Sequence, residues 1–560
     1  MAKTIDRRSF LKGALATGAA AGTISLMGCS SPSTAESAQS DSAAPDGAQA
    51  ARSWEVVPDP ISDDQISETV DVDVVVVGAG MSGMSAFMHA AEAGAKTVII
   101  EKLDTYHGRG LDFAAIGTKI QNEAGIKINK GQLVNDLVKA SGYKANGKLI
   151  KLWADHSGEV FDRLIDMTVA DGGEVTLGSG SSASADAEDF ATRTYPTDHM
   201  FGALVEGSMN LIGRMEKAGQ EAGGESRYNT KAEQLITDDS GAVVGVIASN
   251  GDSYIKFNAA KGVILATGDY HNNPEMVAEW CPLIQNAEGS VYPEVDANTG
   301  DGINMALWAG GTVQLSDHAA MVHPIFGGGA MSAASYMKVN ADGQRFCNEN
   351  TSLPGISNMY MTNGGKVWAI FDSDYEAQMP KMSPLSNYNN NTAGPLTKYF
   401  SDGTMDPANP GSPTEVVNLC MEEGTTTEAN SIEELAEAIG VPADALVATV
   451  DRYNELVDLG VDEDFGKDVA DLQPIKKAPF YASQLTAKIL CVASGLNVDS
   501  QMRVLNADNQ PLGGLYAVGN VMGNFFANDY PICAPGLSHG RCLTLGALIG
   551  EAVATGTELA

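Results

Sequence analysis

The sequence predicts an α/β fold built around a parallel sheet, and a strand–turn–helix–strand run is the first sign of it. Residues 71–77 are rich in valine, which is typical of a strand buried on both faces of a sheet. A Gly-x-Gly-x-x-Gly motif follows at once, at residues 78–83. Residues 84–93 then predict a helix, and residues 96–100 predict a second strand that ends at Glu101.

This order of elements is typical of the βαβ unit that binds a dinucleotide. Gly78 permits the tight turn, Gly80 lets the backbone approach the pyrophosphate, and Gly83 lets the helix pack closely on the strand. The phosphates are expected at the N-terminus of the helix, and Glu101 is placed to bond the ribose hydroxyls. The unit alone does not distinguish FAD from NAD.

The N-terminal residues 1–29 predict an export signal. Residues 6–12 are Asp-Arg-Arg-Ser-Phe-Leu-Lys, and the twin arginine with the weakly apolar stretch after it is typical of twin-arginine export, which carries folded proteins. The apolar stretch 14–27 is too short to span a membrane. It ends in Leu-Met-Gly-Cys, which resembles a lipobox, so Cys29 is the expected lipidation site. We therefore expect a lipid anchor on the outer face of the cytoplasmic membrane.

Residues 30–65 are rich in Ser, Ala, Asp, Gln and Pro and predict a disordered tether. The sequence contains 71 acidic and 35 basic side chains, a formal net charge of −36, which argues against a nucleic-acid partner. Its seven cysteines include no C-x-x-C pair and no C-x-x-C-H haem site. We therefore expect no metal centre, no iron–sulfur cluster and no c-type haem.

Five further segments resemble, in order, the flavoprotein family of soluble fumarate reductases, urocanate reductases and 3-ketosteroid dehydrogenases. They are Lys261–Gly268, Asn298–Ile303, Asp342–Glu349, Gly514–Asn520 and Pro535–Gly540. The resemblance covers roughly residues 70–555. It implies an FAD-binding, Rossmann-like domain in two sequence segments, with an α+β capping domain inserted between them. The active site is expected between cap and flavin.

We place the first FAD segment at residues 66–317, the cap at 318–490 and the second FAD segment at 491–560. The residues that the resemblance implies at the cofactor are Gly78, Gly80, Met81, Ser82, Gly83, Glu101, Lys102, Gly108, Gly110, Ala115, Gly117, Thr267, Gly268, Asp301, Asn520, Gly536, Leu537 and Ser538. Membrane-bound relatives attach FAD to a histidine, and alignment on Ala114 and Ala115 puts Leu111 there. We therefore expect non-covalent FAD, although His107 lies close by.

The dicarboxylate reductases of the family bind substrate with arginines and histidines, which this sequence lacks at the matching positions. Leu353 takes the place of the proton-donating arginine, Cys533 that of a second arginine, and Cys491 that of a histidine. The family positions of an acidic residue and another arginine fall in the glycine-rich stretch 327–332, which contains neither residue type. A buried dicarboxylate needs cationic partners. We therefore expect a neutral or mostly apolar substrate.

The closing segment resembles the ketosteroid branch, in which a tyrosine hydroxyl and a glycine N–H bind a ketone oxygen. Gly536 matches that glycine, and Tyr530 matches the tyrosine if two residues are inserted. Arg109, between two glycines, is a candidate proton donor or anion clamp. Weaker candidates for the site are Tyr270, His271, His539, Tyr336 and Tyr360.

The resulting hypothesis is an FAD-dependent reductase of a carbon–carbon double bond conjugated to a carbonyl or aromatic system. Tyr530 is the first candidate for the proton donor. The alternatives are a ketosteroid-type dehydrogenase that runs the reaction in reverse and a non-catalytic flavin carrier at the membrane. With no haem motif and no room for another domain, electrons are expected from a separate membrane cytochrome or flavoprotein.

Overall fold

The computed structural model describes residues 51–559, apart from residues 111, 179–192, 203, 252, 293–295, 325–327 and 383–411. The twin arginine, Cys29 and Leu111 therefore lie outside the described residues. Residues 51–560 belong to one structural unit.

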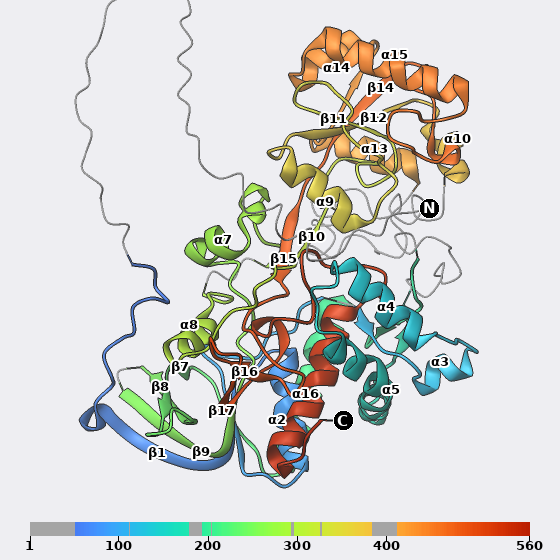
Figure 1. Ribbon diagram of the computed structural model, residues 1–560. Helices are drawn as coiled ribbons and strands as arrows, with labels where there is room; N and C mark the ends of the chain where they lie inside the picture. The colour runs from blue at the N-terminus through green and yellow to red at the C-terminus, as the bar shows by residue number, and fades with distance from the viewer. Residues whose placement is uncertain are drawn as a thin grey trace, which may run out of the picture. The chain divides into compact units, whose positions relative to one another are not determined.

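The FAD-side sheet has eight strands, and its parallel core is β17-β9-β1-β2-β6 (Figure 1). The strands are β1 (Ile66–Val77), β2 (Thr97–Ile100), β6 (Glu225–Arg227), β7 (Lys231–Thr237), β8 (Val243–Asn250), β9 (Ser253–Leu265), β16 (Arg503–Leu505) and β17 (Pro511–Ala517). The last two come from a part of the chain more than 230 residues beyond β9 and still join the same sheet. The predicted fold class, with its FAD domain in two sequence segments, is confirmed.

Two helices pack together against this sheet, α2 (Met81–Glu92) and α16 (Leu537–Thr555) (Figure 1). Their close approach depends on small residues of α16. A Cβ on Gly546 would lie 2.5 Å from the carbonyl oxygen of Ser82, and one on Gly550 would lie 2.3 Å from that of Ala86. The glycines therefore let the N-terminal and C-terminal segments of the FAD domain form one core.

The remaining helices of this part of the chain lie around the sheet, and a small sheet forms beside α16. They are α3 (Lys119–Glu123), α4 (Lys130–Ala140), α5 (Gly147–Ala170), α6 (Leu204–Glu221), α7 (Pro274–Trp280) and α8 (Asp301–Trp308), with strands β3 (Phe113–Ala114), β4 (Thr176–Leu177) and β5 (Asp198–Met200). The small sheet has the order β3-β5-β4. Its strand β3 packs against α16.

The cap has its own four-stranded antiparallel sheet in the order β11-β12-β14-β13 (Figure 1). Its elements are β11 (Met337–Asn340), β12 (Val367–Asp372), β13 (Thr426–Ala429), β14 (Phe480–Gln484), α9 (Leu353–Thr362), α10 (Tyr375–Gln378), α13 (Pro413–Glu422), α14 (Ile432–Ile439) and α15 (Ala443–Leu459). The antiparallel strands β10 (Ala320–His323) and β15 (Lys488–Val492) lead into and out of it. The sheet and its helices form an inserted α+β unit, as predicted.

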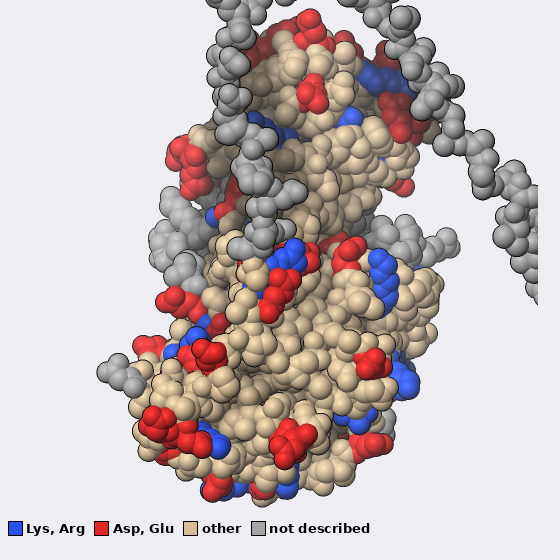
Figure 2. Space-filling model, turned by 60° about the vertical axis from the view of Figure 1, so that its left-hand side comes forward, with Lys and Arg blue, Asp and Glu red and all other residues tan. Residues whose placement is uncertain are grey.

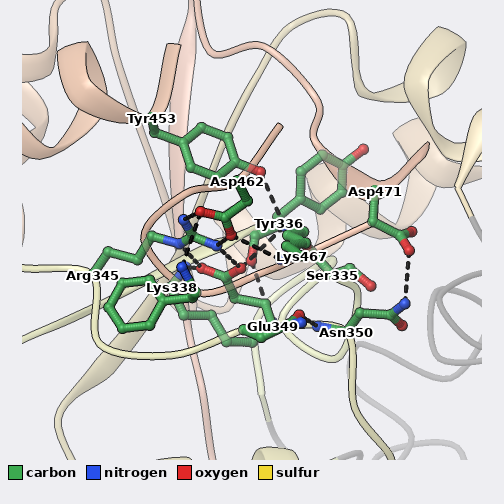
Figure 3. Close-up of polar contacts among 12 residues, drawn as sticks. Ser335, Tyr336, Lys338, Arg345, Glu349, Asn350, Tyr453, Asp462, Lys467 and Asp471 are labelled. Atoms are coloured by element: carbon green, nitrogen blue, oxygen red, sulfur yellow. Dashed lines mark hydrogen bonds and ion pairs between the residues drawn. The ribbon is translucent and has the colours of Figure 1, made fainter. Parts of the chain in front are cut away.

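A buried ion network holds the cap together, and the G-x-R-F-x-N-E segment is part of it (Figure 3). The guanidinium of Arg345 donates to Glu349 at 2.8 and 3.0 Å and to Asp462 at 2.7 Å. The ammonium of Lys467 lies 3.1 Å from Glu349 and donates to the hydroxyl of Tyr453 at 3.0 Å. Burial tends to raise the pKa of Glu349, but Lys467 and Arg345 outweigh it and lower that pKa. Arg345 therefore has a structural role.

The predicted tether is folded at its C-terminal end, which corrects the reading from composition. The rings of Trp54 and Trp280 lie 4.6 Å apart, and Arg52 forms an ion pair with Glu279 at 2.6 Å. The backbone N–H of Ile61 donates to the side chain of Gln234 at 3.1 Å. Residues 51–65 therefore pack on the FAD-side domain. Composition could not predict this, because it does not show that Trp54 has an apolar partner in Trp280.

Candidate active site

A cavity of about 460 Å³ lies at the carboxyl ends of β1, β2 and β9, where Val77, Ile100 and Ala266 line it. Open α/β sheets bind their ligands at this edge. The cap contributes Leu353 of α9 to the wall, and β10 contributes His323. The cavity therefore runs from the nucleotide motif to the junction between the FAD domain and the cap.

The three motif glycines have separate structural reasons. Gly78 has a φ of +105°, and a Cβ on it would lie 2.5 Å from the carbonyl oxygen of Ala266. A Cβ on Gly83 would lie 1.9 Å from the carbonyl oxygen of Gly78. A Cβ on Gly80 would meet no protein atom within 4 Å, although Gly80 lines the cavity. The chain therefore leaves open space at Gly80, where a pyrophosphate fits at the N-terminus of α2.

The carboxylate of Glu101, which is predicted to bond the ribose, lines the cavity and is held in place by two backbone hydrogen bonds. Glu101 accepts hydrogen bonds from the backbone N–H groups of Ala79 at 2.7 Å and Leu103 at 3.0 Å. The ammonium of Lys102 donates to Asp301 at 2.8 Å, and both side chains line the cavity. These groups suit hydroxyl and phosphate oxygens, so the described residues fit the dinucleotide that the motif predicts.

Most of the predicted cofactor residues line this one cavity. Those that do are Gly78, Gly80, Met81, Ser82, Glu101, Lys102, Gly110, Thr267, Gly268, Asp301, Asn520, Gly536 and Ser538. Gly83, Gly108, Ala115, Gly117 and Leu537 are not among the lining residues. Gly108 instead packs against α6, since a Cβ there would lie 2.8 Å from the carbonyl carbon of Ser208. For the residues of both groups, contact with the cofactor stays a prediction.

The cavity wall carries apolar side chains beside polar ones such as His323, Tyr530 and Arg109. Its apolar and sulfur-containing lining residues are Val291, Met305, Met321, Leu353, Leu490, Cys491 and Ile532. Leu353 and Cys491 are two of the positions where the dicarboxylate reductases carry cations, and both lie on the wall. The cap's Arg345 is bonded within the ion network, and Arg452 is bonded to Asp464 at 2.7 Å. Neither of these cap arginines is among the residues that line the cavity.

The lysines and the arginine among the described lining residues already have partners. Lys102 pairs with Asp301, and Lys231 pairs with Glu233 at 3.0 Å. The guanidinium of Arg109 lies 4.7 Å from the centre of the Tyr292 ring. Arg109 is therefore the arginine that faces the cavity among the described residues.

Tyr530 and Gly536 come together at the N-terminus of α16. The buried hydroxyl of Tyr530 accepts the backbone N–H of Ser538 at 3.0 Å, and the tyrosine lines the cavity. Gly536 caps α16 with a φ of +80°, and a Cβ on it would lie 2.5 Å from the backbone nitrogen of Phe113. Burial raises the pKa of Tyr530, so the phenol is neutral at physiological pH. The predicted pair thus faces the cavity.

The weaker candidates, with one exception, are directed elsewhere. Tyr270 bonds to His318 at 2.5 Å, and His271 bonds to Asp269 at 2.7 Å. Tyr336 donates to the carbonyl oxygen of Tyr375 at 3.3 Å, and Tyr360 donates to Glu288 at 2.8 Å. None of the four is a lining residue of the cavity. The exception, His539, does line it and bonds to the carbonyl oxygen of Asp112 at 2.9 Å.

The structure adds cavity residues that sequence reasoning missed as site residues. His323 marked only the start of the cap, yet it lines the cavity, and its Nδ1 has no hydrogen-bond partner among the described residues. Burial lowers the pKa of His323 to about 4, so its ring is neutral near pH 7. Asp112 also lines the cavity, and its carboxyl lies close to that of Asp198. Only the tertiary fold brings these two aspartates together.

Comparison with known proteins agrees with this geometry. Residues 73–537 match the profile of the FAD binding domain family. The chain belongs to that family. This flavoprotein is an FAD-dependent oxidoreductase. Residues 4–23 match the profile of the twin-arginine translocation signal, which confirms the predicted export signal.

The relatives of this flavoprotein carry different names. It is 27% identical to vinyl phenol reductase of Lactiplantibacillus plantarum over 521 residues, covering 87% of this chain and 97% of that protein. It is 28% identical to digoxin reductase of Eggerthella lenta, covering 93% and 91%. It is 27% identical to a fumarate reductase (cytochrome) of Shewanella frigidimarina, covering 86% and 77%.

A solved structure shares the fold of the flavoprotein. The crystal structure of the 3-ketosteroid Δ4-(5α)-dehydrogenase of Rhodococcus jostii RHA1, in complex with 4-androstene-3,17-dione, superposes with a TM-score of 0.67. The two chains are 23% identical, and the match covers 88% of this chain and 99% of the other. Across the described residues, no helix combines the length and the apolarity that a membrane span requires.

Proposed function

We propose that this flavoprotein reduces a carbon–carbon double bond conjugated to a carbonyl or aromatic system in a neutral or mostly apolar substrate. The observation that carries the proposal is that Leu353 and Cys491 line the cavity at two positions that are cationic in dicarboxylate reductases. A buried dicarboxylate without cationic partners costs several kcal/mol. The names of the vinyl phenol and digoxin reductases support a neutral substrate, and we do not expect fumarate to be one.

The cofactor supplies the hydride when bound and reduced, and the chain supplies orientation and electrostatics. The hydroxyl of Tyr530 and the backbone N–H of Gly536 are proposed to hold the substrate oxygen. Such donors stabilise negative charge as it develops on that oxygen. Arg109, which lines the same cavity, is proposed as a second candidate proton donor, or as a clamp for negative charge that develops on the substrate. We propose non-covalent FAD held by the lining residues named above.

Electrons are proposed to reach the flavin from a separate membrane cytochrome or flavoprotein. The sequence has no C-x-x-C-H motif, and its net charge of −36 favours a donor protein with a basic docking face. In the view of Figure 2, the acidic side chains of the flavoprotein are spread over the surface rather than gathered in one patch. We therefore expect steering by net charge, with an association rate that falls as salt rises.

Turnover assays with two electron donors test this proposal. With reduced viologen, the purified holoenzyme should reduce neutral enones or vinyl arenes at steady state. With NADH, turnover should be negligible, because the chain has one dinucleotide motif and FAD is proposed to occupy it. Fast NADH-driven turnover would contradict the separate donor, and failure of the whole neutral panel with viologen would contradict the proposed reaction.

We propose that the exported flavoprotein is anchored by a lipid on Cys29. Cys29→Ala should move the protein from the membrane fraction to the soluble fraction, because the thiol is the only attachment point that a lipobox supplies. Arg7→Lys with Arg8→Lys is the control, and it should leave the protein in the cytoplasm. Membrane attachment unchanged by Cys29→Ala would refute the lipid anchor.

A further inference from the structure

The turn between α4 and α5 carries a local excess of positive charge. Residues 137–154 contain no aspartate or glutamate and four lysines, which are Lys139, Lys144, Lys148 and Lys151. The whole chain, by contrast, has 71 acidic against 35 basic side chains. Helices α4 and α5 pack together on the outside of the FAD-side domain (Figure 1), and the last three of these lysines are exposed. We call residues 139–151 the basic turn.

Two exposed apolar side chains lie beside these lysines. Leu315 at 98% and Tyr143 at 69% are the most exposed large hydrophobic side chains among the described residues. Asn528 connects the segments that carry them. Its side-chain oxygen accepts from the ammonium of Lys144 at 2.9 Å, and its backbone N–H donates to the carbonyl oxygen of Asp317 at 2.9 Å. Lysines, a tyrosine and a leucine therefore lie close together on one surface.

The carboxylates near the basic turn do not cancel its charge. Asp136 is 1% exposed and forms an ion pair with Arg193 at 2.6 Å. Asp155 pairs with Lys151, and Asp317 is an exposed acid of the loop that carries Leu315. The Debye length is about 8 Å at physiological ionic strength, so the more distant acids of the chain are screened from this surface. A partner in contact with the basic turn therefore meets a positive surface.

The backbone of Tyr143 lies in the left-handed region, with a φ of +61°, which is uncommon for a bulky residue. The turn is fixed by hydrogen bonds from the N–H of Tyr143 to the carbonyl oxygen of Val138 at 2.9 Å and from the N–H of Asn146 to that of Asn524 at 2.6 Å. Asparagine or glycine adopts this φ with less strain, and a ring that is 69% exposed contributes little to packing. The strained, exposed tyrosine therefore indicates a role outside the fold.

We propose that the basic turn, with Tyr143 and Leu315, is a membrane-facing surface that binds the anionic headgroups of phospholipids. Lysines attract such headgroups, and exposed tyrosine and leucine side chains insert at the boundary between headgroups and acyl chains. The twin-arginine signal directs the folded protein across the membrane, so a lipid surface is available to it. The inference does not depend on the proposed reaction.

The charge of the whole molecule makes this surface an orienting device. A net charge of −36 repels most of the molecule from an anionic membrane, while the basic turn is attracted to it. The donor protein with a basic docking face is then expected on the other faces. An acidic protein would also be attracted by the lysines. Apolar side chains that project singly fit a fluid lipid surface better than the closely packed core of a protein interface.

Cosedimentation with lipid vesicles tests the proposal. The Cys29→Ala holoprotein, which has no thiol for a lipid anchor, should bind vesicles of equimolar phosphatidylcholine and phosphatidylglycerol and should not bind phosphatidylcholine alone. Binding should weaken as salt rises. Each lysine near an anionic surface contributes roughly a factor of five, so the added changes Lys144→Gln, Lys148→Gln and Lys151→Gln should weaken binding about 100-fold.

Three exposed lysines of the cap provide the matched control. Lys366→Gln, Lys476→Gln and Lys477→Gln together change the net charge by the same amount and should leave vesicle binding as in the Cys29→Ala protein. Both triple variants should keep full flavin content, because none of the six lysines lines the cavity. Equal loss of binding in the two variants would show that net charge matters and the basic turn does not, which would overturn the proposal.

Tyr143→Asn separates a role at the membrane from a role in the fold. Asparagine suits the left-handed backbone, so the melting temperature should stay the same or rise. Vesicle binding should fall about tenfold, because the aromatic ring is lost from the interface. Failure of the Cys29→Ala protein to bind phosphatidylglycerol vesicles would overturn the proposal. Salt-sensitive binding to polyglutamate without binding to vesicles would overturn it too, and would assign the surface to an acidic protein.

Discussion

Replacing Gly80 by valine will remove FAD from the protein while the chain stays folded. Gly80 has an extended backbone with a φ of −79°, which valine adopts without strain. A Cβ there meets no protein atom within 4 Å, so the apoprotein has room for the side chain. The same space is where the pyrophosphate is proposed to lie. We expect near-zero flavin absorbance per polypeptide and an unchanged far-UV circular dichroism spectrum.

Two other glycines provide the controls. Gly131→Val introduces the same side chain on the exposed surface of α4, where the nearest atom would lie 3.6 Å away, and should keep full flavin content. Gly83→Val should prevent folding itself, because its Cβ would collide with the carbonyl of Gly78. Normal flavin content in Gly80→Val would show that the cofactor does not use this motif.

Replacing Glu349 by glutamine will destabilise the cap by about 3–5 kcal/mol, the usual cost of breaking a buried ion pair. Glu349 is the carboxylate that both Arg345 and Lys467 contact (Figure 3). The neutral amide leaves Asp462 as the charged partner of Arg345 and removes the carboxylate that the buried ammonium of Lys467 contacts. Because the described residues form two hydrophobic cores, the measurement is hydrogen exchange of β11 and β12 amides rather than one global unfolding curve.

An exposed ion pair of the cap is the matched control. Asp458 pairs with Lys476 at 2.6 Å and is 69% exposed, so Asp458→Asn should change stability by about 0–1 kcal/mol. The lowered pKa of Glu349 means that its contribution is present above about pH 4.3 and is lost as pH falls below that value. In Glu349→Gln, the free energy of unfolding of the cap should therefore fall less steeply as the pH is lowered through the acid range. Exchange as slow as in wild type would show that the network does not stabilise the cap.

The sequence predicted the parts of the fold that local patterns encode. The valine-rich strand, the three glycines and Glu101 lie within 31 residues. Their spacing directly predicts two buried strands joined by a phosphate-binding turn and a helix. The resemblance placed Tyr530, Leu353 and Cys491, which all line the cavity. Residues that depend on long-range packing were harder to predict.

Contacts between distant segments explain the misses. Asp112 and Asp198 are 86 positions apart and meet only because β3 pairs with β5. Trp54 packs against Trp280 of the folded domain. The composition of residues 30–65 could not predict this contact, because the partner lies more than 200 positions away. Tyr270 and His271 follow β9 as predicted, but their hydrogen bonds to His318 and Asp269 turn them away from the cavity.

Anaerobic reoxidation of the reduced holoenzyme tests the central claim most directly. The flavin is reduced with one equivalent of dithionite, excess reductant is removed, and flavin absorbance is followed after mixing with a vinyl phenol, a conjugated enone, an aromatic acrylate or fumarate. We predict rapid return of the oxidised spectrum with at least one of the first three and negligible reoxidation by fumarate. Rapid reoxidation by fumarate, with none by the other compounds, would contradict the account.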